Sequence, residues 1–253
     1  MPFIICLVFA LIAQIISNFA NDYFDYKKGT DGSERLGPPR AVAQGWIPPK
    51  TMLYATLGLL VFDALLGLSL VYYGGWQLIW IGFFIGIFAL AYSAGPYPLS
   101  YHGLGDVCVL VFFGVVPVGF TYYVQTLQWT MAATVCGIAI GLVVINILVA
   151  NNYRDRNTDK QAGKNTSIVL LGEKFGRYFY LFNGIIAVVL CQFFWLEHTF
   201  LAAILPMIYL FPHILTWRKM VKIGSGKALI PILQETGRNV VIFGALLILG
   251  LII

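Results

Sequence analysis

The sequence predicts an all-α polytopic membrane protein, a single domain over residues 1–253 with about eight transmembrane helices. Hydrophobic residues make up 59% of the chain and charged residues only 11%, whereas ordinary soluble domains carry about 25% charged residues. Apolar runs of about 20 residues recur along the whole length, and each is long enough to cross a bilayer core. Because lipid offers the backbone no hydrogen bonds and the runs are too long for barrel strands, we expect helices.

The expected spans follow the apolar runs in order. They cover about residues 2–23, 51–73, 76–95, 104–124, 130–153, 176–196, 199–217 and 237–253. All 16 Lys and Arg residues lie in three stretches, 24–50, 154–177 and 218–238. With eight spans these stretches share one side of the membrane, and the positive-inside rule makes that side cytoplasmic. The net charge of +5 is therefore topogenic charge and does not predict a nucleic-acid-binding surface.

The short connection 96–103 lies on the same expected side but carries no Lys or Arg. Its two prolines and a glycine predict a tight, ordered turn. Asp106 follows closely and stands at the start of the fourth expected span. A second acid, Asp63, lies in the middle of a span and must face the bundle interior or a partner. Both a structural hydrogen bond and a functional role are open for Asp63.

Two acidic stretches stand at the ends of the first and fifth expected spans. Their candidate ligands are Asn21, Asp25 and Asp31 in the first stretch, and Asn151, Asp155 and Asp159 in the second. The second set is spaced i, i+4, i+8, which places all three side chains on one helical face. In the first set Asn21 and Asp25 share a face, and Gly29 is expected to end the helix before Asp31. The repeated pattern predicts two pseudo-repeated halves whose acidic ends meet across a central cavity.

Carboxylate and amide oxygens are hard ligands that suit Mg²⁺, which keeps waters and is completed by substrate phosphate oxygens. Two facing clusters would hold two ions around a diphosphate. Flanking cations would neutralise the remaining charge. These are Lys28, Arg40, Arg154, Arg156 and Lys164. The alternative interpretation is that both stretches are solvated loop charges beside a membrane.

A polyprenyl diphosphate fits both features of the sequence, because its tail dissolves only in lipid and its head needs cations. Metal ions stabilise the charge on a departing diphosphate. The allylic cation left behind needs a dry cavity, where a small aromatic acceptor can attack it. The expected partners are therefore a polyprenyl diphosphate, an aromatic acceptor and the lipid bilayer.

At these residues the sequence resembles the UbiA-type intramembrane prenyltransferase superfamily, and within it the menaquinone-pathway 1,4-dihydroxy-2-naphthoate polyprenyltransferases. The resemblance is carried by residues 21–31, 35–40 with 44–47, 103–106 with 109–114, and 151–159 with 163–166. The first motif is the most specific part, because Asp31 comes six residues after Asp25. In ubiquinone-type relatives the second acid comes four residues after the first.

The resemblance implies a Mg²⁺-dependent prenyl transfer with decarboxylation, giving demethylmenaquinone, at a site open to the cytoplasm in the inner (plasma) membrane. The two acidic sets would bind Mg²⁺ and diphosphate, and Arg40 and Lys164 would contact the diphosphate. Asp106 is the candidate for orienting the acceptor. The family pattern has nine helices, and this chain begins at what resembles the second. Either the start site is placed too late in the sequence or the protein is an eight-helix variant, and we expect the former.

Two alternatives to prenyl transfer onto the naphthoate remain open. One keeps the donor site and takes another aromatic acceptor, such as 4-hydroxybenzoate or homogentisate. The other is a cation or metabolite transporter with acidic gates. Transporter sites usually lie near the membrane midplane, whereas the acids here, apart from Asp63, lie at span ends or outside the spans, which favours the enzyme.

Overall fold

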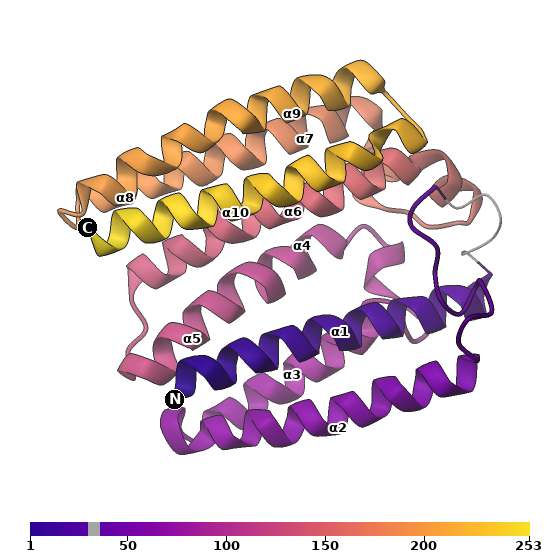
Figure 1. Ribbon diagram of the computed structural model, residues 1–253, viewed down its shortest axis with the longest axis horizontal. Coiled ribbons are helices and arrows are strands. Elements are labelled where there is room, and N and C mark those ends of the chain that lie inside the picture. Colours follow the sequence, from indigo (N-terminus) through magenta and orange to yellow (C-terminus); the bar gives the residue numbers. More distant parts are fainter. Residues whose placement is uncertain (30–35) are drawn as a thin grey trace.

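The computed structural model describes residues 1–29 and 36–253, and within them the chain is helical almost throughout (Figure 1). The described residues form eight helical rods that run back and forth, as the sequence predicted. Seven of these are long and apolar enough to cross a membrane. The third rod is also apolar but has only 15 residues. The protein is therefore an all-α polytopic membrane protein.

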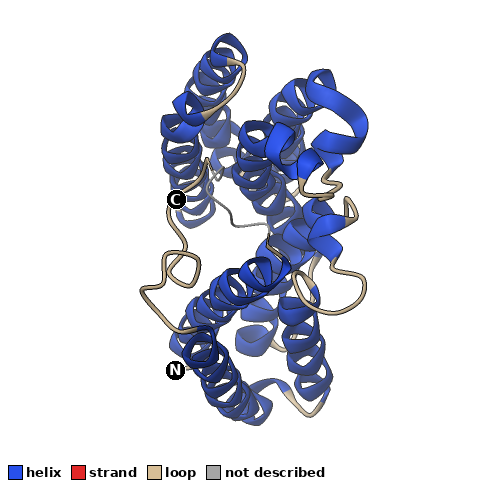
Figure 2. Ribbon diagram, turned by 90° about the vertical axis from the view of Figure 1, so that its right-hand side faces the viewer, coloured by secondary structure: helices blue, strands red, loops and turns tan. Residues whose placement is uncertain are grey.

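The rods divide into two halves of four. The first half holds α1 (Pro2–Lys28), α2 (Pro49–Gly74), α3 (Gln77–Ala91), the short η1 (Leu99–Tyr101), and the continuous rod α4 (Gly105–Leu110), η2 (Val111–Val115) and α5 (Val116–Thr126). The second half holds α6 (Met131–Gln161), α7 (Ser167–Cys191) with η3 (Gln192–Trp195), α8 (Phe200–Ile204) with η4 (Leu205–Tyr209) and α9 (Leu210–Ile223), and η5 (Lys227–Leu229) with α10 (Ile230–Ile252). Figure 2 shows the helices in two groups, one with the N-terminus and one with the C-terminus.

Several helices extend beyond the expected spans. The first continues to Lys28, and Gly29 takes the left-handed conformation with φ 73°, which ends the helix as predicted. The fifth continues to Gln161, well beyond residue 153. The sixth rod begins at Ser167, where the Thr166 side chain caps it by accepting from the Val169 amide at 3.3 Å, and it kinks at Gly172, whose φ of 89° is not helical. An apolar run marks only the part that lies in lipid, whereas a helix can continue through polar residues outside it.

The two acidic stretches lie at the same end of the bundle. In Figure 1 both α1 and α6 run from left to right, so their C-terminal ends are together at the right-hand end. The connection that follows α3 is at this end too, and His102 forms an isolated parallel bridge with Asn165 of the α6–α7 connection. The predicted ordered turn is thus confirmed, and it joins the two halves.

Glycines allow the two halves to pack closely. A Cβ atom added at Gly114 of η2 would lie 2.5 Å from the Gly137 carbonyl oxygen and 2.6 Å from the Gly141 Cα atom, both on α6. Small residues at a helix crossing let backbones approach in this way. The π-helical turn of η2 lies at this crossing. The interior of the second half is filled by apolar side chains, among them Val143, Phe194 and Phe243.

Asp63 of α2 is placed inside the bundle, as expected for a charged residue in the middle of a span. Its side chain is buried, with a residue exposure of 4%, and its Oδ1 atom has no hydrogen-bond partner among the described residues. Helix α2 packs against α1, α3 and α5. The residue belongs to the first half and lies apart from the acidic helix ends.

Candidate functional site

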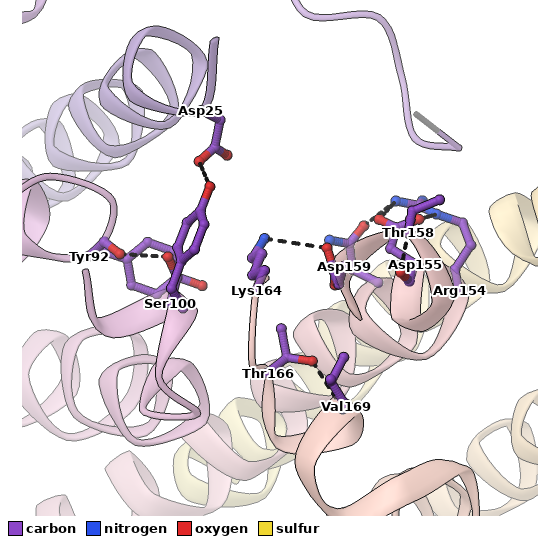
Figure 3. A network of polar contacts seen from close by, with 12 residues as sticks. Asp25, Tyr92, Ser100, Arg154, Asp155, Thr158, Asp159, Lys164, Thr166 and Val169 are labelled. Carbon is purple, nitrogen blue, oxygen red and sulfur yellow. Dashed lines mark hydrogen bonds and ion pairs between the residues drawn. The ribbon is translucent and has the colours of Figure 1, made fainter. Parts of the chain in front are cut away.

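The acidic ends of α1 and α6 face each other across one site. Figure 3 shows Asp25 on one side and Asp155 and Asp159 on the other, with Lys164 between them. The Asp25 and Asp155 carboxylates are both close enough to Asp159 to interact with it electrostatically. The structure therefore brings together the two clusters that the sequence predicted as halves of one site.

Tyr101 lies between the two clusters and contacts both sides. Its hydroxyl donates to Asp25 Oδ1 at 3.0 Å. The Lys28 ammonium lies 4.4 Å from the centroid of its ring, and the Lys164 ammonium lies 5.6 Å from it. The backbone amide of Asn165 donates to the Tyr101 carbonyl at 3.0 Å. Tyr101 thus holds an acid of one half and a lysine of each half around a single ring.

The end of α1 is fixed by bonds to two other segments. Asn21 accepts a hydrogen bond from the Ser93 hydroxyl, and Lys28 donates to the Ser93 carbonyl at 2.7 Å. Asp22 accepts from the backbone amides of Ala41 and Val42 at 3.0 and 3.2 Å. This second contact places the neighbouring Arg40 at the same end of α1.

The second cluster is organised by a buried arginine. The Arg154 side chain is 1% exposed. Its Nε and Nη2 atoms donate to the two Asp155 carboxylate oxygens at 2.7 and 2.5 Å, and Nη2 also donates to Asn151 Oδ1 at 2.6 Å. A bidentate pair of this kind fixes geometry as well as charge. Arg154 therefore orients two of the predicted ligands, and its Nη1 atom has no hydrogen-bond partner among the described residues.

Asp159 has spare coordinating capacity. The Lys164 ammonium lies 3.9 Å from Asp159 Oδ1. Its buried Oδ2 atom has no hydrogen-bond partner among the residues described. Within that part of the chain, no three His, Cys, Asp or Glu side chains converge closely enough to hold a metal ion by themselves. Asp31, the remaining predicted ligand, lies outside the described residues.

Asp106 is buried at the start of α4 and lies beside Ser167, the first residue of α7. It is close to Tyr92, whose hydroxyl would lie 3.4 Å from a Cβ atom added at Gly105. Asp106 itself does not line the cavity described next, whereas Tyr92 does.

An apolar cavity of about 410 Å³ begins beside the acidic site. Tyr92 and Cys108 line the end near the site, and Leu78 and Val124 line the opposite end of the bundle. All lining residues lie in the part of the chain from α1 to α5, so this cavity lies within the first half and not between the halves, where we expected it. Packed side chains fill the interior of the second half.

Three residues of the site were not predicted from the sequence: Tyr92, Ser93 and Tyr101. They lie at the end of α3 and in the connection after it. The signal that could have found them was the ordered Pro-Gly turn on the same membrane side as both acidic stretches. A turn of this kind holds its polar side chains close to the neighbouring helix ends.

The chain is similar to one family of membrane enzymes and to several of its members. Residues 1–228 match the UbiA prenyltransferase family. The 1,4-dihydroxy-2-naphthoate octaprenyltransferase of Haemophilus influenzae is 38% identical over 183 residues, which cover 70% of this chain and 59% of that protein. The protein of the same name from Mycobacterium tuberculosis is 35% identical over 237 residues, 92% of this chain and 79% of that protein. The Mycobacterium leprae protein is 33% identical over 98% of this chain and 85% of its own length.

Proposed function

The chain belongs to the UbiA prenyltransferase family, and we propose that it transfers a polyprenyl group from polyprenyl diphosphate to 1,4-dihydroxy-2-naphthoate. The product would be demethylmenaquinol, the reduced form of demethylmenaquinone, with the carboxylate lost. The observation that carries this proposal is the convergence of two acidic, cation-flanked helix ends beside an apolar cavity. The names of the H. influenzae and M. tuberculosis relatives support the choice of acceptor.

We propose that two Mg²⁺ ions bind with the diphosphate between the two clusters. The proposed ligands are Asn21, Asp25, Asp31, Asn151, Asp155 and Asp159. The donor set fits, because Mg²⁺ commonly takes one or two carboxylates and completes its shell with waters and phosphate oxygens. Ligands divided between two helix ends leave coordination positions free for water and phosphate oxygens, whereas a site closed by protein ligands would not. When bound, the ions neutralise the diphosphate and favour its departure.

The basic residues of the site are proposed to have two roles, contacting the diphosphate and positioning the acidic ligands. Lys28, Arg40 and Lys164 are proposed to contact the diphosphate oxygens, since each lies at the end of the bundle where the clusters meet. Arg154 holds Asn151 and Asp155 in place, and its unpartnered Nη1 atom is available to the diphosphate. Fixed donors of this kind stabilise developing charge without reorganising during the reaction.

The proposed reaction takes place beside the apolar cavity. The C1–O bond of the prenyl diphosphate breaks and its electron pair leaves with the diphosphate. The acceptor carbon that bears the carboxylate bonds to C1, and the carboxylate leaves as CO₂, returning its electron pair to the ring. The apolar walls exclude the water that would otherwise quench the allylic cation. Because Asp106 adjoins Tyr92, we propose that it orients the acceptor by way of that phenol.

Membranes containing the protein test the proposal directly. Given Mg²⁺, farnesyl diphosphate and 1,4-dihydroxy-2-naphthoate, they should form the prenylated, decarboxylated product, detected by mass spectrometry. Asp25→Ala and Asp155→Ala should each lower the rate by a factor on the order of 10² or more, because each removes a charged group that faces the diphosphate. Full activity in either variant, or no product from the unaltered protein, would overturn the proposal. Parallel assays with 4-hydroxybenzoate and homogentisate decide between acceptors.

We also propose that the acidic end faces the cytoplasm. The described Lys and Arg residues of the three basic stretches lie in or beside the helix ends that gather here, and cytoplasmic loops carry such an excess. A cysteine placed at Ser225, in the connection before α10, should react with an impermeant thiol reagent only in inside-out vesicles. Labelling in right-side-out vesicles alone would reverse the assignment.

A further inference from the structure

We infer that Gln14, Ser17 and Tyr92 form the hydrogen-bonding wall that receives the aromatic acceptor, at the end of the cavity nearest the acidic site. This inference rests on the proposed function and assigns its acceptor subsite. All three residues line the cavity, two from α1 and one from the end of α3. None of them belongs to the two acidic clusters.

Helix α1 carries a polar line that points into the cavity. Gln14, Ser17 and Asn21 are spaced i, i+3, i+7, which places them on one helical face. Asn21 contacts Ser93 in the acidic site, while Gln14 and Ser17 continue the line into the cavity wall. Asn18 is also polar but does not line the cavity. The wall is otherwise mainly apolar, so the polar positions mark one side of it.

These polar groups have no partner within the described protein. The Gln14 side chain is exposed and that of Ser17 is half-buried. Among the described residues neither of them, nor the Tyr92 hydroxyl, has a hydrogen-bond partner, and all three residues line the cavity. An amide or hydroxyl left unpaired in apolar surroundings costs about 1–3 kcal/mol. A polyprenyl tail offers such groups nothing, because it is pure hydrocarbon. A dihydroxynaphthoate ring offers two hydroxyls and a carboxylate.

The position of the wall suits attack on the donor. Ser17 lies one helical turn from Asn21, so a ring bound there is next to the prenyl carbon that is attached to the diphosphate. Phe88 and Phe112 also line this cavity, with ring centroids 4.9 Å apart, and they provide an aromatic surface against which a fused ring can pack. The cavity beyond, toward Leu78, is left for the tail.

The test separates acceptor binding from donor binding. Purified protein in phospholipid vesicles is assayed with Mg²⁺, farnesyl diphosphate and 1,4-dihydroxy-2-naphthoate, varying each substrate in turn. Gln14→Leu, Ser17→Ala and Tyr92→Phe should each raise the acceptor KM by about five- to tenfold, the effect of losing one hydrogen bond. The donor KM should change by less than about twofold. Asn18→Leu, an amide replaced on the same helix outside the cavity, should leave both KM values unchanged.

The outcomes distinguish this inference from the proposed function. An unchanged acceptor KM in all three variants overturns the acceptor wall and leaves prenyl transfer intact. An equal rise in both KM values also overturns it, because that indicates a general disturbance of the site. An unaltered protein that prenylates none of the three acceptors overturns the proposed function. In that case, the dissociation constant of 1,4-dihydroxy-2-naphthoate, measured by its fluorescence without a donor, decides the inference. Gln14→Leu should raise this constant by about five- to tenfold.

Discussion

The two halves of the bundle differ in how tightly they are packed. In the most apolar stretch of α6, 56% of the residues are buried, whereas the corresponding figure for α1 and for α2 is 11%. The buried cores fill the second half, and the cavity lies in the first. One half therefore supplies a rigid frame for the second acidic cluster, and the other supplies space. The proposed transfer of a bulky polyprenyl tail would use both.

Polar contacts between helices reinforce the tight half. His213 of α9 is fully buried, and its ring nitrogens contact the Tyr209 hydroxyl and the Leu181 carbonyl, both at 3.1 Å. Asn239 of α10 donates to the Thr216 hydroxyl at 3.0 Å. Hydrogen bonds of this kind join helices inside membranes. If the second half is rigidly packed and the first half encloses the substrate cavity, substitutions in the two halves should have different effects.

Removing Arg154 should have the largest effect on stability. Arg154→Met leaves Asp155 and Asn151 without their donor, and losing one partner of a buried ion pair costs about 3 kcal/mol or more. The free energy of unfolding, measured by denaturant titration in detergent micelles, should fall by that amount. Lys160→Met, an exposed position near the end of the same helix, should change it by less than about 0.5 kcal/mol. Equal losses in both variants would contradict the role of Arg154 as an organiser.

A methyl group added to a glycine should destabilise the second half but not the first. A Cβ atom at Gly184 of α7 would lie 2.3 Å from His213 Nε2, whereas one at Gly82 of α3 meets no atom within 4 Å. Gly184→Ala should destabilise the protein by about 2 kcal/mol through overpacking. Gly82→Ala should not destabilise it. A tolerant Gly184 would show that the second half is not the rigid frame.

Filling the cavity should change donor preference with little effect on stability. Gly82 lines the cavity and Gly58 does not, and neither has a neighbour within 4 Å of an added Cβ atom. Gly82→Leu should lower kcat/KM for a long polyprenyl diphosphate by about fivefold relative to farnesyl diphosphate, equivalent to about 1 kcal/mol of overpacking. Gly58→Leu serves as the matched control. An unchanged ratio in Gly82→Leu would place the tail elsewhere.

The smallest expected effect concerns a single hydrogen bond in the tight half. Tyr209→Phe removes the hydroxyl that contacts His213 and keeps the ring in place. The two residues are four apart in one rod, and a single neutral hydrogen bond can contribute as little as about 0.5 kcal/mol, so the unfolding free energy should fall by about that much while turnover stays unchanged. A large loss of turnover would mean that this network acts on the site as well as on the frame.

Hydropathy and charge were enough to predict the span count and the meeting of the acidic ends, because both follow from which residues tolerate lipid. Gly29 was also recognisable as a helix end. The buried position of Arg154 was not predictable, since an arginine at a span end reads as a solvated charge. The cavity was not predictable either, because residues such as Leu78 that line a space look the same in sequence as residues that fill a core.

The central claim is that Asp25 and Asp155, from different halves, belong to one donor site. Its most direct test is the binding of farnesyl thiodiphosphate, an unreactive donor analogue, to the purified protein with and without Mg²⁺. We expect Asp25→Asn and Asp155→Asn each to weaken binding by at least about tenfold, because each removes a charge that faces the same diphosphate. Binding at full strength in either variant would show that one cluster alone holds the donor.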